Sequence, residues 1–210
     1  MKLKSSPPQQ SLTSVMIKVH IWYPYNVPGF DTWDWLTDGA EEIQDVQSLI
    51  PIHQFSWGHA GMEFIEVPSQ NGRFVYNGYR SFWTSNSDWS QHSLGRVAMA
   101  LEQDVAAEYG YHPHNTMTLA EGLNETLIYE YWNSLINQSL EYYHRGFNSS
   151  NAVANAIQSG MPPKRMDAPE YNPFTASDYG APLGFSNPLY LQKWLEEINA
   201  WLVLPQQNFK

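Results

Sequence analysis

The first half of the chain contains apolar runs of the kind that form β-strands, separated by short polar segments. Residues Val15–Tyr23 read VMIKVHIWY, which is rich in β-branched and aromatic side chains and ends at a proline. This composition is typical of a central strand. Two more strands are predicted over Ser56–Val67 and Arg73–Trp83. The segment between them ends in Asn71-Gly72, a strong signal for a tight hairpin turn, so we expect these two strands to pair.

In the second half, the apolar positions recur every three or four residues, which is the period of an amphipathic helix. We expect helices over Asp88–Tyr109, over Thr118–Tyr143 (as one long helix or two), over Ser149–Ser159 and over Asn187–Leu204. Strands followed by helices predict an α+β fold. Its small antiparallel sheet should pack against the helix over Ser149–Ser159, with the other helices outside.

The chain of 210 residues is expected to form a single domain over residues 15–204, because its length matches one domain better than two. Residues 1–14 are rich in Ser, Pro and Gln and are expected to form a flexible tail. Residues 160–182 contain five prolines and are expected to form a long surface loop, which in a compact domain is often functional.

Composition argues against several classes of partner and cofactor. The formal net charge is −10 and the sequence pI is near 5.0, so no basic excess is present to bind nucleic acid or an anionic membrane. The absence of cysteine excludes disulfides and thiolate metal sites in the chain as written, and no metal or cofactor is expected. The N-terminal lysines are not followed by an apolar run, so we expect synthesis in the cytoplasm without a cleavable signal peptide.

Two motifs have the residues that catalysis requires. Gly58-His59-Ala60 places a histidine in the second predicted strand between two small residues, which leaves room for another group to approach the imidazole. Ser149 lies at the start of a predicted helix, where a thiol would have a lowered pKa and backbone N–H groups could hold an oxyanion. Taken separately, each motif is better explained without catalysis, by a half-buried histidine satisfied by a neighbour and by an ordinary Ser/Asn helix cap.

Taken together, the motifs resemble those of a known enzyme family. The order is GHA at 58–60, YRSFW at 79–83, then the helix start NSSNAVANAIQSG at 148–160. This order resembles the permuted papain-like hydrolases related to NlpC/P60, in which the histidine precedes the nucleophile and which include amidase effectors of bacterial type VI secretion. The lecithin:retinol acyltransferase group has the same order. The resemblance covers about residues 15–160.

The chain departs from this family at the nucleophile, because the family pattern has Cys where this sequence has Ser149. Our first interpretation is an inactivated Cys-to-Ser variant. A natural serine nucleophile is a second, although the pattern G-x-S-x-G is absent, and a pseudoenzyme is a third. The resemblance implies that His59 is the general base. A third group must orient the imidazole, and we expect it on the partner strand, with Ser81 first and Asn77 second.

The resemblance implies a cysteine-type amide hydrolase that acts on peptidoglycan or peptide as a secreted antibacterial toxin. It would reach the periplasm of a target cell through a secretion apparatus and would require a cognate inhibitor (immunity) protein. One alternative is a non-catalytic module that binds glycan or protein. Another is an acyltransferase or deamidase that uses the same thiol chemistry.

Three other features are interpreted as structural. His112-Pro113-His114 has no third metal ligand at a useful spacing and is expected to lie in a surface loop. The acidic residues between Asp31 and Asp45 are expected to form a solvated face. Most of the tryptophans are expected to pack in the core, although some of them could line a groove.

Overall fold

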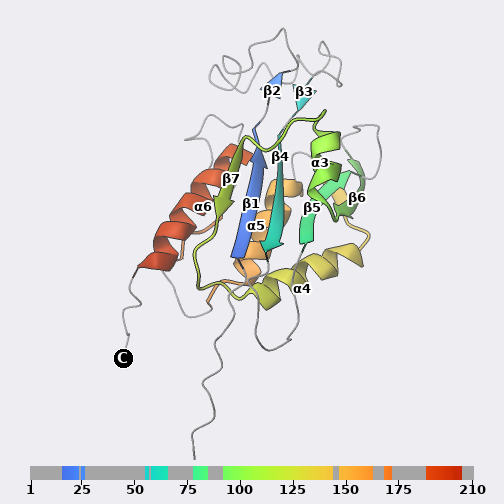
Figure 1. Cartoon of the computed structure of the whole chain (residues 1–210). Helices are drawn as coiled ribbons and strands as arrows, with labels where there is room; N and C mark the ends of the chain where they lie inside the picture. The colour runs from blue at the N-terminus through green and yellow to red at the C-terminus, as the bar shows by residue number, and fades with distance from the viewer. Residues whose placement is uncertain are drawn as a thin grey trace, which may run out of the picture.

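The computed structural model describes residues 16–23, 25–26, 55–56, 58–65, 78–84, 92–143, 147–162, 168–171 and 188–204. These residues form a mixed α+β fold in which a curled antiparallel sheet packs against helices (Figure 1). The predicted α+β class is therefore confirmed.

The main sheet has six antiparallel strands in the spatial order β7-β1-β4-β5-β6-β8. The strands are β1 (Met16–Trp22), β4 (His59–Ile65), β5 (Gly78–Thr84), β6 (His92–Ala98), β7 (Asn115–Thr118) and β8 (Glu141–Tyr143). A second sheet pairs β2 (Tyr25–Asn26) with β3 (Phe55–Ser56). The three strands predicted from sequence are present as β1, β4 and β5, and β4 pairs with β5 as expected.

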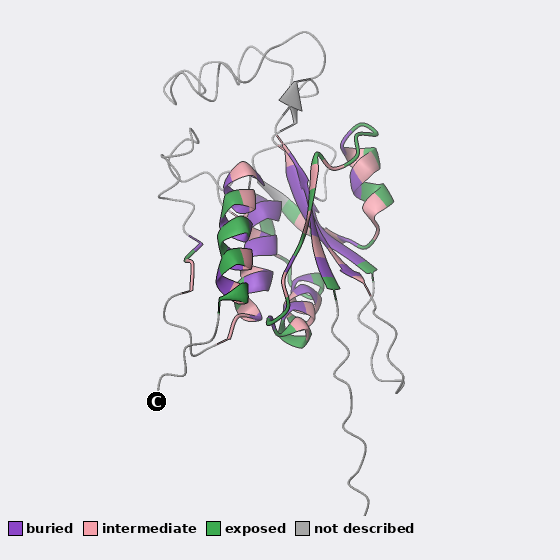
Figure 2. Ribbon diagram, turned by 60° about the vertical axis from the view of Figure 1, so that its left-hand side comes forward, coloured by how far each residue is buried: buried purple, intermediate pink, exposed green. Residues whose placement is uncertain are grey.

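Four helices are described: α3 (Leu101–Ala107), α4 (Glu125–Ile136), α5 (Ser149–Ser159) and α6 (Pro188–Val203). Helices α5 and α6 lie on one face of the sheet and α3 lies on the other, while α4 crosses near one end of the strands (Figures 1 and 2). The predicted helices over Ser149–Ser159 and Asn187–Leu204 are confirmed.

The prediction of a helix over Asp88–Tyr109 is wrong for its first part. Residues His92–Ala98 form β6, and only Leu101–Ala107 are helical. Strand β6 pairs with β5 on one side and β8 on the other. Leu94 is 57% exposed, so it does not belong to the buried stripe of a helix. Pairing with the neighbouring strands therefore determines the structure here, in spite of the helical spacing of Leu94 and Val97.

The long helical prediction over Thr118–Tyr143 is also corrected. Only Glu125–Ile136 are helical, with Asn124 as the N-cap accepting the Leu127 N–H. Two residues earlier, Gly122 has a φ of +120°, which is incompatible with an α-helix. At the other end the chain leaves the helix and forms β8, where the sheet provides the backbone partners.

Alternation along β4 gives the sheet two different buried faces. Ala60, Met62 and Phe64 belong to the apolar core, into which α5 packs. Ala152 and Ala156 on α5 are small and fully buried, which allows the helix to approach the sheet closely. The buried residues in Figure 2 lie mainly where helices and sheet face each other. His59, Gly61 and Glu63 point to the opposite face, which α3 covers.

Several predictions concern segments outside the described residues. These are the 1–14 tail, the turn at Asn71-Gly72, the acidic residues from Asp31 to Asp45, Asn77, and most of the 160–182 loop. Among the helices that are described, none has the length and apolarity needed to cross a bilayer.

Candidate active site

Helix α5 begins at Ser149 because Asn148 caps it. The Asn148 side chain accepts hydrogen bonds from the Ser150 and Asn151 backbone N–H groups, and the Asn151 side chain accepts the Asn148 N–H in return. This reciprocal capping box fixes the direction in which the helix starts. Ser149 therefore occupies the first helical position, where the positive end of the helix dipole favours a negative charge.

The start of α5 lies where two central strands separate. The pairing of β4 with β5 ends at Gly61–Ser81, beyond which β5 continues to pair with β6 and β4 with β1. The Ala60 N–H donates to Ser149 Oγ at 3.3 Å. The side chain at position 149 is therefore held against the strand that carries His59, at the residue directly after it.

A tyrosine that the sequence analysis did not identify also contacts Ser149. Tyr142 on β8 is 5% exposed, and its side chain is hydrogen-bonded to that of Ser149. Burial, with a further contribution from the charge of Glu108, raises the pKa of Tyr142 well above its usual value. The phenol therefore remains neutral and can act as a donor to an anion at position 149.

The imidazole of His59 is completely buried and forms a short hydrogen bond with Asp104 on α3. His59 Nε2 lies 2.7 Å from Asp104 Oδ2, and both side chains are 0% exposed. Because an ionised carboxylate only accepts hydrogen bonds, Nε2 carries the proton. The other ring nitrogen, Nδ1, is buried and has no hydrogen-bond partner, so it is the atom available as a base.

Asp104 accepts hydrogen bonds from three side chains of β5 in addition to His59. Tyr79 donates to Oδ2, while Ser81 (2.9 Å) and Trp83 donate to Oδ1. Burial alone would raise the pKa of Asp104, but the charge of His59 and the hydrogen bonds from His59, Tyr79 and Ser81 hold it below its usual value. The carboxylate is therefore ionised in spite of its burial.

This geometry corrects the expected role of Ser81. The residue that binds the imidazole is Asp104, and Ser81 contacts that carboxylate instead. Asn77, the second choice, lies outside the described residues. The sequence did contain a signal for Asp104, because it lies with Leu101, Val105 and Glu108 at helical spacing, so that two carboxylates interrupt an apolar stripe.

Two tryptophans fix the plane of the His59 ring. The imidazole stacks on Trp83 with ring centroids 4.0 Å apart and planes at 22°, and it contacts Trp22 at 5.5 Å. Stacked rings and a charged hydrogen bond together restrict rotation about both side-chain torsions. The imidazole is therefore oriented before any ligand is present.

Gly61 is required for this arrangement. A Cβ atom built at Gly61 would lie 1.7 Å from the hydroxyl oxygen of Tyr79, which is shorter than any non-bonded contact. The missing side chain on β4 leaves the space through which Tyr79 reaches Asp104. The small residues near His59 thus make room for the hydrogen-bond network.

The structure brings the two predicted catalytic positions to the same end of β4, but to different faces. Ser149 contacts the Ala60 backbone at the strand separation. The imidazole of His59 lies with Asp104 on the face covered by α3. The Ser149 hydroxyl therefore contacts the residue next to His59 in the chain. The Nδ1 atom of His59 has no hydrogen-bond partner, so no hydrogen bond links it to that hydroxyl.

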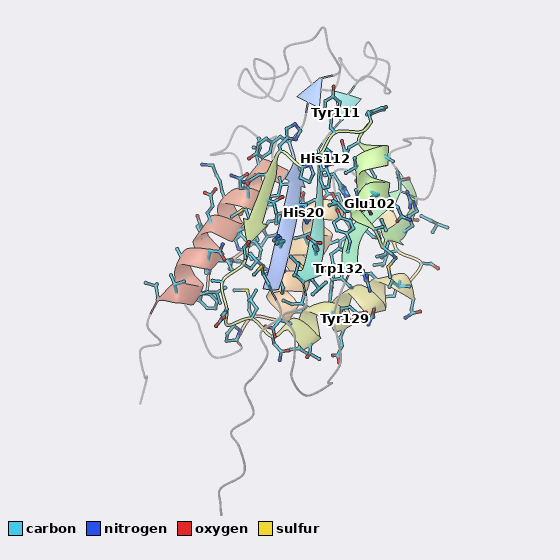
Figure 3. The ribbon with its side chains drawn as sticks, viewed as in Figure 1. His20, Glu102, Tyr111, His112, Tyr129 and Trp132 are labelled. Carbon is cyan, nitrogen blue, oxygen red and sulfur yellow. The ribbon has the colours of Figure 1, made fainter. Side chains whose placement is uncertain are left out.

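A second buried histidine lies on the same face of the sheet. His20 on β1 (Figure 3) has Nδ1 3.0 Å from Thr116 Oγ1 and Nε2 3.1 Å from Glu63 Oε2. Burial lowers its pKa, against the opposing effect of the Glu63 carboxylate. These contacts link the side chains of β7, β1 and β4, and both ring nitrogens of His20 are occupied.

No metal site is evident in the part of the chain that the structure describes. The described residues contain no cluster of three or more His, Asp or Glu side chains that could hold a metal ion. His112 lies in the loop after α3 (Figure 3) and is exposed, as expected for the His-Pro-His segment. His114 Nδ1 accepts the Tyr23 N–H at 3.1 Å.

Comparisons with protein-family models, with curated proteins and with solved structures gave no match to this chain.

Proposed function

We propose that this protein is an amide hydrolase of the papain-like type, with the nucleophile at position 149. His59 is the general base, and Asp104 is the group that orients it. The observation that carries the proposal is the position of α5: residue 149, at the start of that helix, hydrogen-bonds the backbone directly beside a buried His–Asp pair. A nucleophile, a base and a group that orients the base are the parts that acyl transfer requires.

With cysteine at position 149, the proposed reaction proceeds through an acyl-enzyme. Nδ1 of His59 takes the thiol proton, and the thiolate attacks the amide carbonyl carbon. Backbone N–H groups at the start of α5 stabilise the resulting oxyanion. The imidazolium then protonates the leaving amine as the C–N bond breaks. Water, deprotonated by His59, hydrolyses the thioester and releases the carboxylic acid and the free thiol.

For this reaction Nδ1 must approach the sulfur atom. Ser149 Oγ accepts from the Ala60 N–H, whereas Nδ1 of His59 has no hydrogen-bond partner, so the proposal requires α5 or the imidazole ring to move until these two atoms are in contact. Serine at position 149 has a much higher pKa than cysteine, and we therefore expect the chain as written to have very low activity.

The proposed substrate is the stem peptide of peptidoglycan, and the proposed role is that of a secreted antibacterial toxin. Both come from the resemblance to amidase effectors described above. A toxin of this kind requires an inhibitor protein in the cell that produces it. Because the chain has a formal net charge of −10, we expect that inhibitor to present a neutral or basic surface.

The direct test is to restore the thiol and assay purified sacculi. Ser149→Cys should release muropeptides, and the double variant Ser149→Cys with His59→Ala should not. Ser150→Cys is the matched control, because Ser150 is also buried in the first turn of the same helix. If Ser149→Cys folds and releases nothing where a known endopeptidase is active, the proposed murein substrate is wrong.

A second candidate is a non-catalytic binding module with a native serine. Ser149 is 3% exposed, and its hydroxyl hydrogen-bonds both the Ala60 N–H and the Tyr142 side chain, as a structural serine would. The natural gene distinguishes the two candidates, because a serine codon at position 149 supports the binding module and a cysteine codon supports the enzyme. Binding of the unmodified chain to sacculi without hydrolysis by Ser149→Cys would also support the module.

A further inference from the structure

A buried arginine on β5 lacks the anionic partner that such a residue normally has. Arg80 is 5% exposed and lies on the face opposite His59. Its Nη1 donates to the Tyr79 carbonyl at 2.7 Å and its Nη2 to the Tyr129 hydroxyl at 3.1 Å. Nε is buried without a partner. In the part of the chain that is described, no carboxylate forms an ion pair with Arg80.

This arrangement is energetically unfavourable without a ligand. A guanidinium group has five N–H donors and a permanent charge, and both of its hydrogen bonds here are to neutral oxygens. The face of the Tyr129 ring, 5.2 Å from the guanidinium carbon, compensates the charge only in part. Burial of a charge that has no counter-ion is costly, and an anionic ligand would remove that cost.

Among the described residues, β5 reaches the surface at Gly78, beside the guanidinium group. Gly78, at the start of β5, is exposed, and a Cβ atom built there would lie 3.4 Å from Arg80 Nη1. Gly78 also has a φ of +104°, a conformation that favours glycine. Tyr129 on α4, at the end of the strands where α4 crosses (Figure 3), borders the other side. A small ligand could therefore approach the guanidinium beside Gly78.

We propose that Arg80 binds an oxyanion, a carboxylate or phosphate group, in a site bordered by Gly78 and Tyr129. The planar fork of a guanidinium matches the two oxygens of either group. Tyr129 would orient the guanidinium from one face, and the Tyr79 carbonyl would hold Nη1. This site is separate from the proposed hydrolase site, because Arg80 points away from His59 and Gly78 pairs with Phe64, at the opposite end of β4 from His59.

The first test follows the Arg80 Nε–H directly by ¹H–¹⁵N NMR, with inorganic phosphate and acetate titrated separately at constant ionic strength. We expect a saturable shift of the Arg80 signal. The exposed Arg96, whose Nε donates to the Thr84 carbonyl, is the control and should not saturate. Saturation with phosphate alone would identify a phosphate ligand, and saturation with acetate alone a carboxylate. Absence of saturation with both anions would overturn the proposal.

The second test separates a binding role from a structural one. Arg80→Met keeps most of the volume and removes the charge. If Arg80 is a binding residue, this variant should have an unchanged or higher Tm without anion, and it should lose the anion-induced rise. For a site saturated 100-fold above Kd, that rise is roughly 5–10 °C in the unmodified chain and in the control Arg96→Met. A lower Tm of Arg80→Met without anion, together with an unchanged response to phosphate and acetate, would overturn the proposal.

Discussion

Replacing Asp104 with asparagine should change both the stability of the fold and the protonation of His59. The carboxylate has two oxygens with different partners: Oδ1 accepts from Ser81 and Trp83, and Oδ2 accepts from His59 and Tyr79. An indole N–H can only donate. The carboxamide of asparagine must therefore keep its oxygen toward Trp83 and turn its NH₂ group toward His59.

The consequence for His59 is a change of tautomer. Nε2 would have to accept a hydrogen bond from the asparagine NH₂, so the proton would move to Nδ1, the atom that the proposed mechanism needs as a base. The variant also removes one charge of a buried pair whose side chains are both 0% exposed. Loss of one partner from such a pair costs about 3–5 kcal/mol, and we expect a loss near 3 kcal/mol because the asparagine oxygen keeps two donors.

Urea unfolding at pH 7 measures this loss, and ¹⁵N NMR of the imidazole identifies the tautomer. Glu102→Gln is the control, since Glu102 is exposed on the same helix (Figure 3), and it should change the unfolding free energy by less than about 0.5 kcal/mol. A loss below about 1 kcal/mol for Asp104→Asn, with the Nε2 proton retained, would show that the carboxylate neither stabilises the fold nor orients the ring.

Three further predictions follow from the same network. The pKa of Asp104 is held below its usual value of 3.8, so the stability that the ionised carboxylate provides is complete above that value and is lost as the pH falls through the lowered pKa. When unfolding is measured as a function of pH, the unfolding free energies of Asp104→Asn and of the unmodified chain should therefore converge only below about pH 4. Gly61→Ala should lower the unfolding free energy by about 1–3 kcal/mol, because the added methyl group displaces the Tyr79 hydroxyl. In a double-mutant cycle measured by urea unfolding, Gly61→Ala should be less destabilising when Tyr79→Ser is also present. Strictly additive effects of the two substitutions would refute the steric explanation. Tyr142→Phe should lower the unfolding free energy by about 1 kcal/mol, because Ser149 loses a buried hydrogen-bond partner; an unchanged urea midpoint would argue against that contact.

The parts of the fold that could be predicted are those in which local pattern and tertiary environment agree. The β-branched run of β1 and the capped, alanine-rich α5 match their predicted elements closely. Strand β6 could not be predicted, because Leu94 and Val97 have a helical spacing by coincidence and pairing with two neighbouring strands determines their structure.

The candidate site was predictable to a similar extent. The positions of His59 and Ser149 follow from a strand and a helix start, both of which are local features. Asp104 and Tyr142 come from α3 and β8, which reach the site only through the order of strands in the sheet. No spacing in the sequence encodes that order, although the carboxylate at Asp104 in an apolar stripe is a local sign that it has a buried partner.

The central claim, that position 149 holds a nucleophile activated by its surroundings, is tested most directly by the thiol pKa of Ser149→Cys. This thiol would be the only cysteine of the chain, so its ionisation can be followed by thiolate absorbance in the ultraviolet. We predict a pKa well below the ordinary value of about 8.5 that returns toward it when His59→Ala is added, whereas the neighbouring Ser150→Cys should not titrate below the ordinary range. A thiol pKa at or above about 8.5 in folded Ser149→Cys, unaffected by His59→Ala, would contradict the claim.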